Sequence, residues 1–441
     1  MKVLLASAPV TGHVNPLLVV ARMLKDAGHE TALYTGSIFG KKARAAGIGF
    51  YSLPADVDFD LTDVDAAFPE LQLHPPGLQR VLYAFKHVFA DAIPSQFRGL
   101  EAVLREFPAD LIVHETAFFG VLPLLLGARA SRPASACLSI STTPLSREDG
   151  APWGPGLPPA ANAAQREQYL ATAAHVDSVL TTPSREHTDR ILDDLGVHKK
   201  LPASLLESSA LLSDLILQPC GPGFEFPYRE PSGKKVHFIG PLLPDGVGDI
   251  PPQVEEARKA GRRIVLVSQG TIANYDLGLL AAPVIQALGN DDDKLILVTT
   301  GGLPVDRIPC PLSSNTVAMT HLNFQKIFPY VDVLVALGGY GTVTQALSCG
   351  VPMVLAGVTE DKPEIAARVA WTGSGIRLDT ATPSVADLRE SIARVLSDPA
   401  YRANAKRLAL EFTALDGARE VPRLLEALVA DRLSAADSVT S

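Results

Sequence analysis

The chain has 441 residues, of which 47% are apolar and 20% are charged. This composition is typical of a globular protein, and the length predicts two or three domains rather than one. The formal net charge of −9 argues against a nucleic-acid-binding surface, because such a surface needs clustered Lys and Arg.

Nothing in the sequence predicts export or a membrane span. The N-terminal run MKVLLASAPV is too short for a signal peptide and is interpreted as a buried strand. The longest apolar stretch, residues 117–127, is too short to cross a bilayer. The four cysteines form no C-x-x-C pair. We therefore expect a cytoplasmic protein without a structural zinc site.

The first half of the chain alternates between strands and helices. Strands are predicted over Lys2–Ser7 and Thr31–Thr35, with a helix over Pro16–Ala27 that Asn15 would cap. Further strands are predicted over residues 110–114 and 136–140. This alternation predicts a parallel sheet with helices on both faces.

A second alternation begins near Arg263. It contains the strand-like runs RIVLVS, KLILVTT, VDVLVAL and VPMVLAG, and helices over residues 277–288, 342–349, 383–398 and 401–415. A Pro- and Gly-rich segment separates the halves. The predicted organisation is a domain over 1–240, a linker over 241–253, and a second domain over 254–434 whose last helices return toward the first. Ligands of such sheets bind beyond the carboxyl ends of the strands.

A glycine turn in the second half is the most informative motif. Gly338, Gly339 and Gly341 lie between a buried strand and a helix. The amides of Gly341, Thr342 and Val343 would point out of the helix N-terminus, where anions bind. On this turn alone, a tight connection without a ligand is equally plausible.

Taken together, the motifs resemble the GT-B glycosyltransferases that use nucleotide sugars. The similarity is greatest to plant secondary-metabolite and bacterial macrolide-type enzymes. It is carried, in chain order, by GHVNP (12–16), FIGP (238–241), SQGT (268–271), GGYGT (338–342), GVP (350–352) and an acidic-polar pair at 361–362. The resemblance implies an α/β fold in which two Rossmann-like, doubly wound domains face each other across a cleft.

The resemblance also implies an activity and a set of site residues. It implies inverting transfer of a sugar from a UDP- or TDP-sugar to a hydroxyl of a small, fairly apolar acceptor, with no cofactor and no metal. The donor-binding residues carried over are Ser268, Thr271, His321, Gln325, Gly339, Gly341, Thr342, Gln345, Asp361 and Lys362. Phe118, Phe119 and Trp153 are candidates for acceptor binding, together with the Pro- and Gly-rich loop 146–161 and the segment 60–77.

His13 stands at the position of the family's catalytic base. Imidazole suits this task because it titrates near neutral pH. Glu115 stands where the family has an Asp that orients the base. His114 is adjacent, but strand alternation turns it to the opposite face. The carboxylates between Asp56 and Asp60 are interpreted as a solvated loop rather than a metal site.

The sequence departs from the family pattern at four positions. Leu337 replaces a His, Gln345 a Glu, Lys362 a Gln and Ile365 an Asn. Gln345 can still hydrogen-bond a ribose, and Lys362 adds a point charge. The Leu337 side chain cannot donate a hydrogen bond. We therefore expect the phosphates to be bound by backbone amides, Ser268, Thr271, Thr342 and Lys362.

Three other functions fit parts of the pattern. A non-catalytic nucleotide-sugar-binding partner is compatible with Leu337 and Gln345, although His13 argues against it. A nucleotide-sugar epimerase would share the two-domain architecture and need no acceptor. An NAD-type dehydrogenase is disfavoured because no G-x-G-x-x-G follows the first strand.

Overall fold

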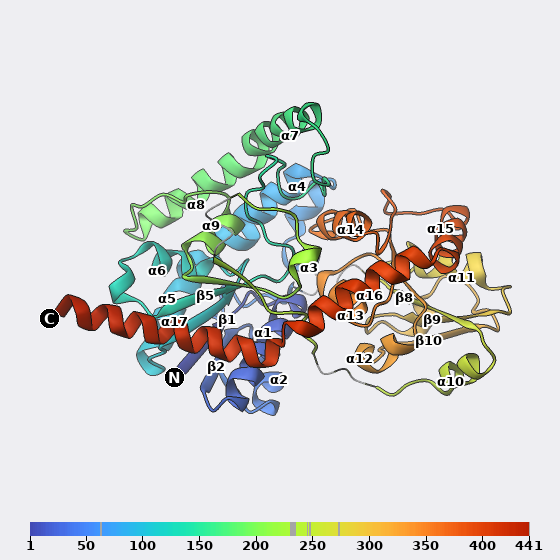
Figure 1. The fold of residues 1–441 in the computed structure, drawn as a ribbon. Helices are drawn as coiled ribbons and strands as arrows, with labels where there is room; N and C mark the ends of the chain where they lie inside the picture. The colour runs from blue at the N-terminus through green and yellow to red at the C-terminus, as the bar shows by residue number, and fades with distance from the viewer. Residues whose placement is uncertain (62–63, 230–234, 245, 247, 272–273, 441) are drawn as a thin grey trace.

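The protein contains two parallel β-sheets, each in its own α/β domain (Figure 1). The computed structural model describes residues 1–61, 64–229, 235–244, 246, 248–271 and 274–440. The first sheet has the order β3-β2-β1-β4-β5-β6-β7, with β1 Lys2–Ala6, β2 Glu30–Thr35, β3 Gly49–Ser52, β4 Leu111–Glu115, β5 Ala134–Leu138, β6 Leu215–Gln218 and β7 Val236–Phe238. The second has the order β10-β9-β8-β11-β12-β13, with β8 Arg263–Ser268, β9 Lys294–Thr299, β10 Thr316–Met319, β11 Val333–Ala336, β12 Met353–Leu355 and β13 Gly375–Arg377.

Helices surround both sheets. Those of the first domain are α1 Thr11–Asp26, α2 Gly40–Ala45, α3 Val64–Ala67, α4 Leu78–Tyr83, α5 Ile93–Glu106, α6 Leu122–Leu126, α7 Ala163–Val176, α8 Thr182–Asp194 and α9 Leu205–Leu212, with π-helical segments η4 Ala84–Ala90 and η7 Asp177–Thr181. The others are α10 Pro252–Lys259, α11 Ala281–Leu288, α12 Phe324–Ile327, α13 Tyr340–Ser348, α14 Lys362–Trp371, α15 Val385–Ser397, α16 Pro399–Ala414 and α17 Gly417–Thr440. Among the described residues, no helix combines the length and apolarity needed to cross a membrane.

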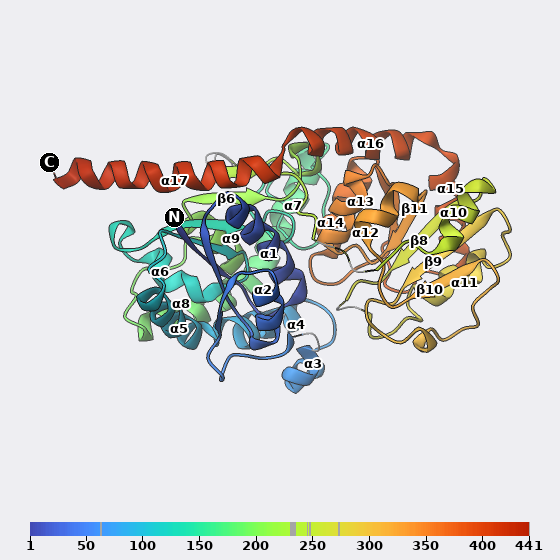
Figure 2. The same cartoon turned by 90° about the horizontal axis from the view of Figure 1, so that it is seen from below.

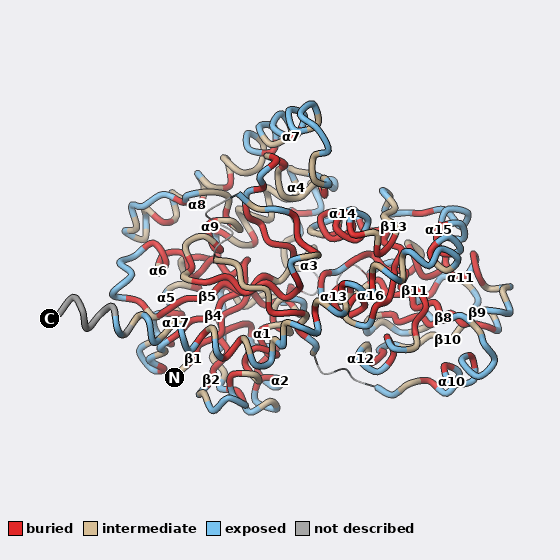
Figure 3. Tube along the Cα trace, in the orientation of Figure 1, coloured by how far each residue is buried: buried red, intermediate tan, exposed pale blue. Residues whose placement is uncertain are grey.

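Each sheet is buried on both faces, as parallel sheets usually are. In β1, Leu5 packs into a core shared with α1, whereas its neighbour Leu4 packs on the other face with Leu100 of α5. Figure 3 shows the strands of both domains as buried segments inside more exposed helices. The predicted doubly wound α/β architecture is therefore confirmed.

Helix α1 begins earlier than the sequence predicted. It starts at Thr11, because the N–H groups of His13 and Val14 already donate to the carbonyl of Val10. Pro16 therefore lies inside the helix, and Asn15 does not cap it; its side chain accepts a hydrogen bond from Lys42 instead. The earlier start places His13 in the first turn of the helix.

The C-terminal helix returns to the first domain. α16 packs on α13 of the second domain, and α17 then runs along the first domain, where Val421 and Leu425 join the core of α1 (Figures 1 and 2). The start of α17 lies beside the segment that leaves β7 toward the linker. A Cβ on Gly417 would lie 2.2 Å from the carbonyl oxygen of Ile239, so only glycine fits there.

A buried ion network joins the two domains. Arg368 of α14 donates to Glu225 of the first domain at 2.8 Å and to Glu364 at 2.8 Å. The other oxygen of Glu364 accepts the N–H groups of Gly154 and Gly156, each at 2.9 Å. Burial raises the pKa of the Glu225 carboxyl despite the guanidinium beside it.

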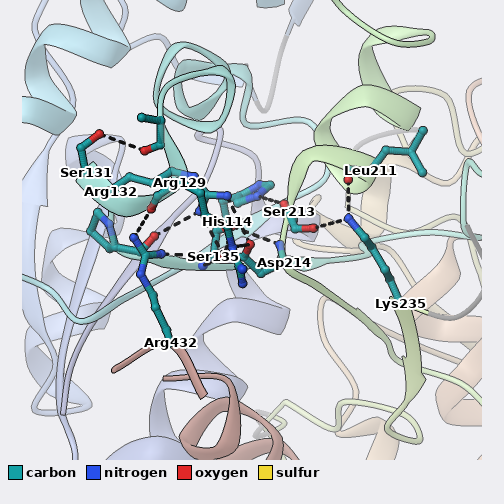
Figure 4. A network of polar contacts seen from close by, with 12 residues as sticks. His114, Arg129, Ser131, Arg132, Ser135, Leu211, Ser213, Asp214, Lys235 and Arg432 are labelled. Carbon is teal, nitrogen blue, oxygen red and sulfur yellow. Dashed lines mark hydrogen bonds and ion pairs between the residues drawn. The ribbon is translucent and has the colours of Figure 1, made fainter. Parts of the chain in front are cut away.

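A second network ties α17 to the first domain (Figure 4). Asp214 accepts hydrogen bonds from Arg129, Arg132 and the hydroxyl of Ser135, and Arg432 of α17 approaches the same carboxylate at 4.0 Å. Burial alone would raise the pKa of Asp214, but Arg132 and the Ser135 N–H outweigh it and hold the pKa below its ordinary value.

We expect Asp214→Asn to lower the free energy of unfolding by about 3 kcal/mol at pH 7, because three guanidinium groups lose their counter-charge. A carboxyl with a depressed folded-state pKa stabilises above its unfolded pKa of about 4. The difference between wild type and variant should therefore shrink as pH falls below about 4. Urea unfolding of both proteins from pH 3 to 7 measures this difference. The control is Asp193→Asn, because Asp193 pairs with Lys200 on the surface, and it should change the free energy of unfolding little.

We expect Arg368→Met to lower the free energy of unfolding by about 3–5 kcal/mol, because two buried carboxylates are left unpaired. Arg389→Met is the matched control, since Arg389 is 50% exposed and pairs with Asp291 on the surface. The control should lower the free energy of unfolding by less than about 1 kcal/mol. Equal losses in the two variants, measured by urea unfolding, would contradict the importance of the network.

Candidate active site

The carboxyl edge of the first sheet faces the helix N-termini of the second domain. Gln218, the last residue of β6, donates to the hydroxyl of Tyr340, which begins α13, at 2.6 Å. The loop after β5 reaches α14 through Gly154 and Gly156. α13 and α14 themselves follow the carboxyl ends of β11 and β12. The two ligand-binding edges expected for such sheets therefore meet.

His13 and Glu115 come together because β1 and β4 are neighbours. The register pairs Ala6 with His114, so the segments that follow both strands are adjacent. His13 Nδ1 lies 3.3 Å from a Glu115 oxygen, a close contact that does not meet the geometry of a hydrogen bond. The His13 side chain keeps 20% of its surface exposed, whereas Glu115 is fully buried.

Backbone amides fix the Glu115 carboxylate in place. One oxygen accepts the N–H of Ala8 at 3.0 Å and the other accepts the N–H of Ala117 at 2.6 Å. A buried carboxylate held in this way can orient an imidazole and stabilise its protonated form. With Nδ1 directed at Glu115, Nε2 is the nitrogen left to meet a substrate.

His114 has a different environment, as strand alternation predicted. It is fully buried, and its Nε2 contacts the Ser213 hydroxyl at 2.8 Å. Burial lowers its pKa to about 4, with smaller opposing effects from Glu115. His114 is therefore a neutral, packed side chain.

The glycine turn presents open backbone at the N-terminus of α13. A Cβ on Gly339 would meet no protein atom within 4 Å, and one on Gly341 would meet only the Gln345 amide at 4.0 Å. The free amides differ slightly from the prediction, because the Val343 N–H donates to the Gly339 carbonyl. The amides without an intrahelical partner are those of Tyr340, Gly341 and Thr342.

Other predicted donor residues surround this turn. Ser268 is buried at the end of β8 and accepts the Gly270 N–H, while Thr271 is exposed beside it. Gln345 donates to the Gly341 carbonyl at 2.9 Å. Leu337, the residue in place of the family's His, is buried in the core.

Asp361 directly precedes α14 and Lys362 is its first residue, so the pair follows a strained loop residue, Glu360. Glu360 has a φ of +56°, which a residue with a side chain seldom adopts, and such strain often accompanies functional sites. Its carboxylate contacts the Lys362 ammonium. Burial raises the pKa of Asp361, and the Lys362 charge and Ser141 hydroxyl only partly offset it.

The segment that contains the predicted donor-binding residues His321 and Gln325 also contacts the linker. Gln325 donates its amide to the Pro244 carbonyl at 2.8 Å, and Asn323 donates to the Gly246 carbonyl at 2.9 Å. His321 is exposed and packs by Gly302. In this structure Gln325 positions the linker.

Two of the three predicted acceptor residues belong to the hydrophobic core. Phe118 is fully buried beside Tyr34, and Phe119 is 1% exposed among the helices of the first domain. Both were predicted to bind the acceptor, but the chain turns into a short helix at Phe119 and both rings lie inside the domain, closed to solvent. Trp153 remains half-buried, and its ring N–H donates to the Thr142 hydroxyl.

An apolar cluster next to α1 was only partly predicted. Val10, the residue before α1, packs with Leu61 and Val88, and half-buried Phe59, Phe68 and Phe89 surround them. The segment 60–77 supplies part of this cluster, although residues 62 and 63 lie outside the described residues. On the η4 side, the signal was the spacing of Ala84 and Val88, two members of the cluster that stand four residues apart.

The carboxylates Asp56 and Asp58 tie their loop to neighbouring segments of the first domain. Asp58 accepts the N–H of Ser37, and Asp56 accepts the hydroxyl of Ser95.

Comparisons with known proteins identify the family. A family model described as "Erythromycin biosynthesis protein CIII-like, C-terminal domain" matches residues 284–428. The chain is 34% identical to UDP-glycosyltransferase 2 of Phaeomoniella chlamydospora, covering 97% of this chain and 96% of that protein. It is also 34% identical to 4'-demethylrebeccamycin synthase of Lentzea aerocolonigenes, covering 97% and 99%.

The fold is similarly shared. The crystal structure of the calicheamicin glycosyltransferase CalG4 superposes with a TM-score of 0.72 at 20% identity, covering 97% of this chain and 98% of that one. Because sequence likeness and architecture both extend over nearly the whole chain, this protein belongs to the GT-B glycosyltransferase family that includes the macrolide-type enzymes.

Proposed function

We propose that this glycosyltransferase transfers a sugar, with inversion, from a UDP- or TDP-sugar to a hydroxyl of a small, fairly apolar acceptor. The observation that carries the proposal is the 3.3 Å contact between His13 and the buried Glu115, at the edge that faces α13. The names of the two 34% identical relatives, one UDP-dependent and one a natural-product synthase, support the donor and acceptor classes.

In the proposed reaction, His13 Nε2 removes the proton of the acceptor hydroxyl. The acceptor oxygen forms a bond to the anomeric carbon as the bond from that carbon to the diphosphate oxygen breaks. The nucleoside diphosphate leaves with the electron pair, and His13 holds the proton as an imidazolium beside Glu115. Attack from the face opposite the leaving group inverts the anomeric configuration.

The leaving diphosphate would bind at the N-terminus of α13. Its charge would be stabilised by the first-turn amides, by the positive end of the helix dipole and by the hydroxyl of Thr342. Ser268, Thr271 and Lys362 would complete the phosphate contacts, with Gln345 and Asp361 directed at ribose and sugar hydroxyls. This arrangement requires neither a metal ion nor a cofactor besides the sugar nucleotide.

The acceptor would bind between the apolar cluster around Val10 and the loop that carries Trp153. Both border the edge on which His13 lies. Few charged side chains take part in that cluster, so aromatic, polyketide, terpenoid or sterol hydroxyls are the favoured substrates.

We expect His13→Ala to reduce kcat by about 10²–10⁴-fold while the dissociation constant of the nucleoside diphosphate stays unchanged, because a general base acts in the chemical step only. Glu115→Gln should reduce kcat less. His175→Ala, an exposed histidine of α7, is the control and should keep full turnover. Calorimetry measures binding, and NMR of the product should show the anomeric configuration opposite to that of the donor. An unchanged kcat in His13→Ala would remove the base from the mechanism.

We expect UDP- or TDP-sugars, but not GDP-sugars, to raise the melting temperature, because a ligand stabilises the state that it binds. Gly341→Val should abolish this shift without lowering the basal melting temperature, since a Cβ there meets only the Gln345 amide, at 4.0 Å, on the side where the phosphates would lie. Thr342→Val tests the hydroxyl alone. A full ligand shift in Gly341→Val would place the diphosphate elsewhere.

A further inference from the structure

Three side chains that the transfer reaction does not use converge on the surface of the first domain. His87 lies in η4, Asp91 directly follows that segment, and His187 lies in α8. His87 Nδ1 is 2.8 Å from one oxygen of Asp91, and His187 Nε2 is 2.6 Å from the other. Ligand atoms of all three residues lie within 4.8 Å of one another.

The local backbone and aromatic neighbours orient these groups. The Asp91 N–H donates to the carbonyl of Lys86, five residues back, which is the π-helical bond, and such π-segments occur frequently at functional sites. The Tyr83 ring packs on the His87 ring with centroids 4.6 Å apart, and the His187 ring meets it edge-on at 5.5 Å. The His87 imidazole is therefore held between two rings rather than free to rotate.

From this convergence we propose that His87, Asp91 and His187 bind one divalent transition-metal ion, of the zinc or cobalt type, that bridges η4 and α8. Two imidazoles and a carboxylate are a donor set preferred by these ions over Mg²⁺ or Ca²⁺. The side chains are 40%, 45% and 20% exposed for His87, Asp91 and His187, which leaves room for a water as fourth ligand.

The ion fits with a small adjustment. Tetrahedral ligands at bonds of about 2.0–2.1 Å stand about 3.3 Å apart. The contacts of 2.8 and 2.6 Å must therefore open by roughly 0.5–0.7 Å, and ligand atoms that are now up to 4.8 Å apart must approach each other. Because Asp91 and His187 are partly exposed, rotation of these two side chains supplies that change, while the Tyr83 ring keeps the His87 imidazole in place. The ion replaces the proton that each ring now shares with Asp91.

A bound ion would connect η4 to α8, because the ligands come from both elements. His87 and Val88 are neighbours in η4, and Val88 packs against Val10 beside the start of α1. α8 contacts the same π-segment but is about 100 residues distant in sequence. An ion at this junction therefore links α8 to the layer that borders the acceptor side of the domain.

Co²⁺ titration of the full-length protein, without a histidine tag and at pH 7.5, tests the site. We expect one Co²⁺ per chain, with visible absorption bands of a four-coordinate ion. His187→Ala should weaken binding by more than the roughly tenfold that loss of an outer partner costs. His198→Ala is the matched control, because His198 is 80% exposed and faces another carboxylate, Asp193.

The Co²⁺ affinities of the two variants decide whether the site exists. Binding that is lost in His187→Ala and kept in His198→Ala supports the site. Equal Co²⁺ affinity in the wild type and His187→Ala overturns it, as does an equal loss in both variants. If His187→Ala unfolds, His87→Ala removes a ligand from the other helix, and X-ray absorption of the cobalt-loaded wild type must show imidazole ligands. A spectrum without imidazole overturns the proposal. Sugar transfer is not needed for any of these measurements.

Discussion

The arrangement of the two domains depends on one buried guanidinium. Arg368 lies between Glu225 of the first domain and Glu364 of its own helix, and all three side chains are almost completely removed from water. A charge at that depth is tolerated only with partners on both sides. Since one partner belongs to each domain, the ion network fixes which edges face each other. Glu364 extends it to the backbone of the loop that carries Trp153.

The candidate catalytic pair follows from strand order in the same way. In a parallel sheet, neighbouring strands deliver their following loops to the same edge. β1 and β4 are neighbours although more than 100 residues separate them, and this brings His13 to Glu115. Glu115 needs no guanidinium or ammonium group to be fixed, because the amides of Ala8 and Ala117 already hold both of its oxygens. Its charge thus remains directed toward His13.

Sequence reasoning worked best where a local pattern determines the structure. Continuous apolar runs identified the buried strands. The helix after the glycine turn was predicted to start within two residues of the observed start of α13. The position of His13 was inferred from a motif, but its place in a helix was not, because Pro16 suggested a later start. The burial of Phe118 and Phe119 was not predicted, since apolar side chains serve pockets and cores alike; only their burial distinguishes the two. The Arg368 network and the meeting of His87 with His187 join distant segments, which no local pattern can reveal.

The return of α17 has a mechanical meaning. The chain passes between the domains twice, once after β7 and once between α16 and α17, and the two passages touch where Gly417 lies against Ile239. α16 packs on the second domain, α17 packs on the first, and only two residues connect them. The C-terminal helices therefore keep the two lobes adjacent, because parting the lobes would expose the buried Val421 and Leu425 or the contact between α13 and α16.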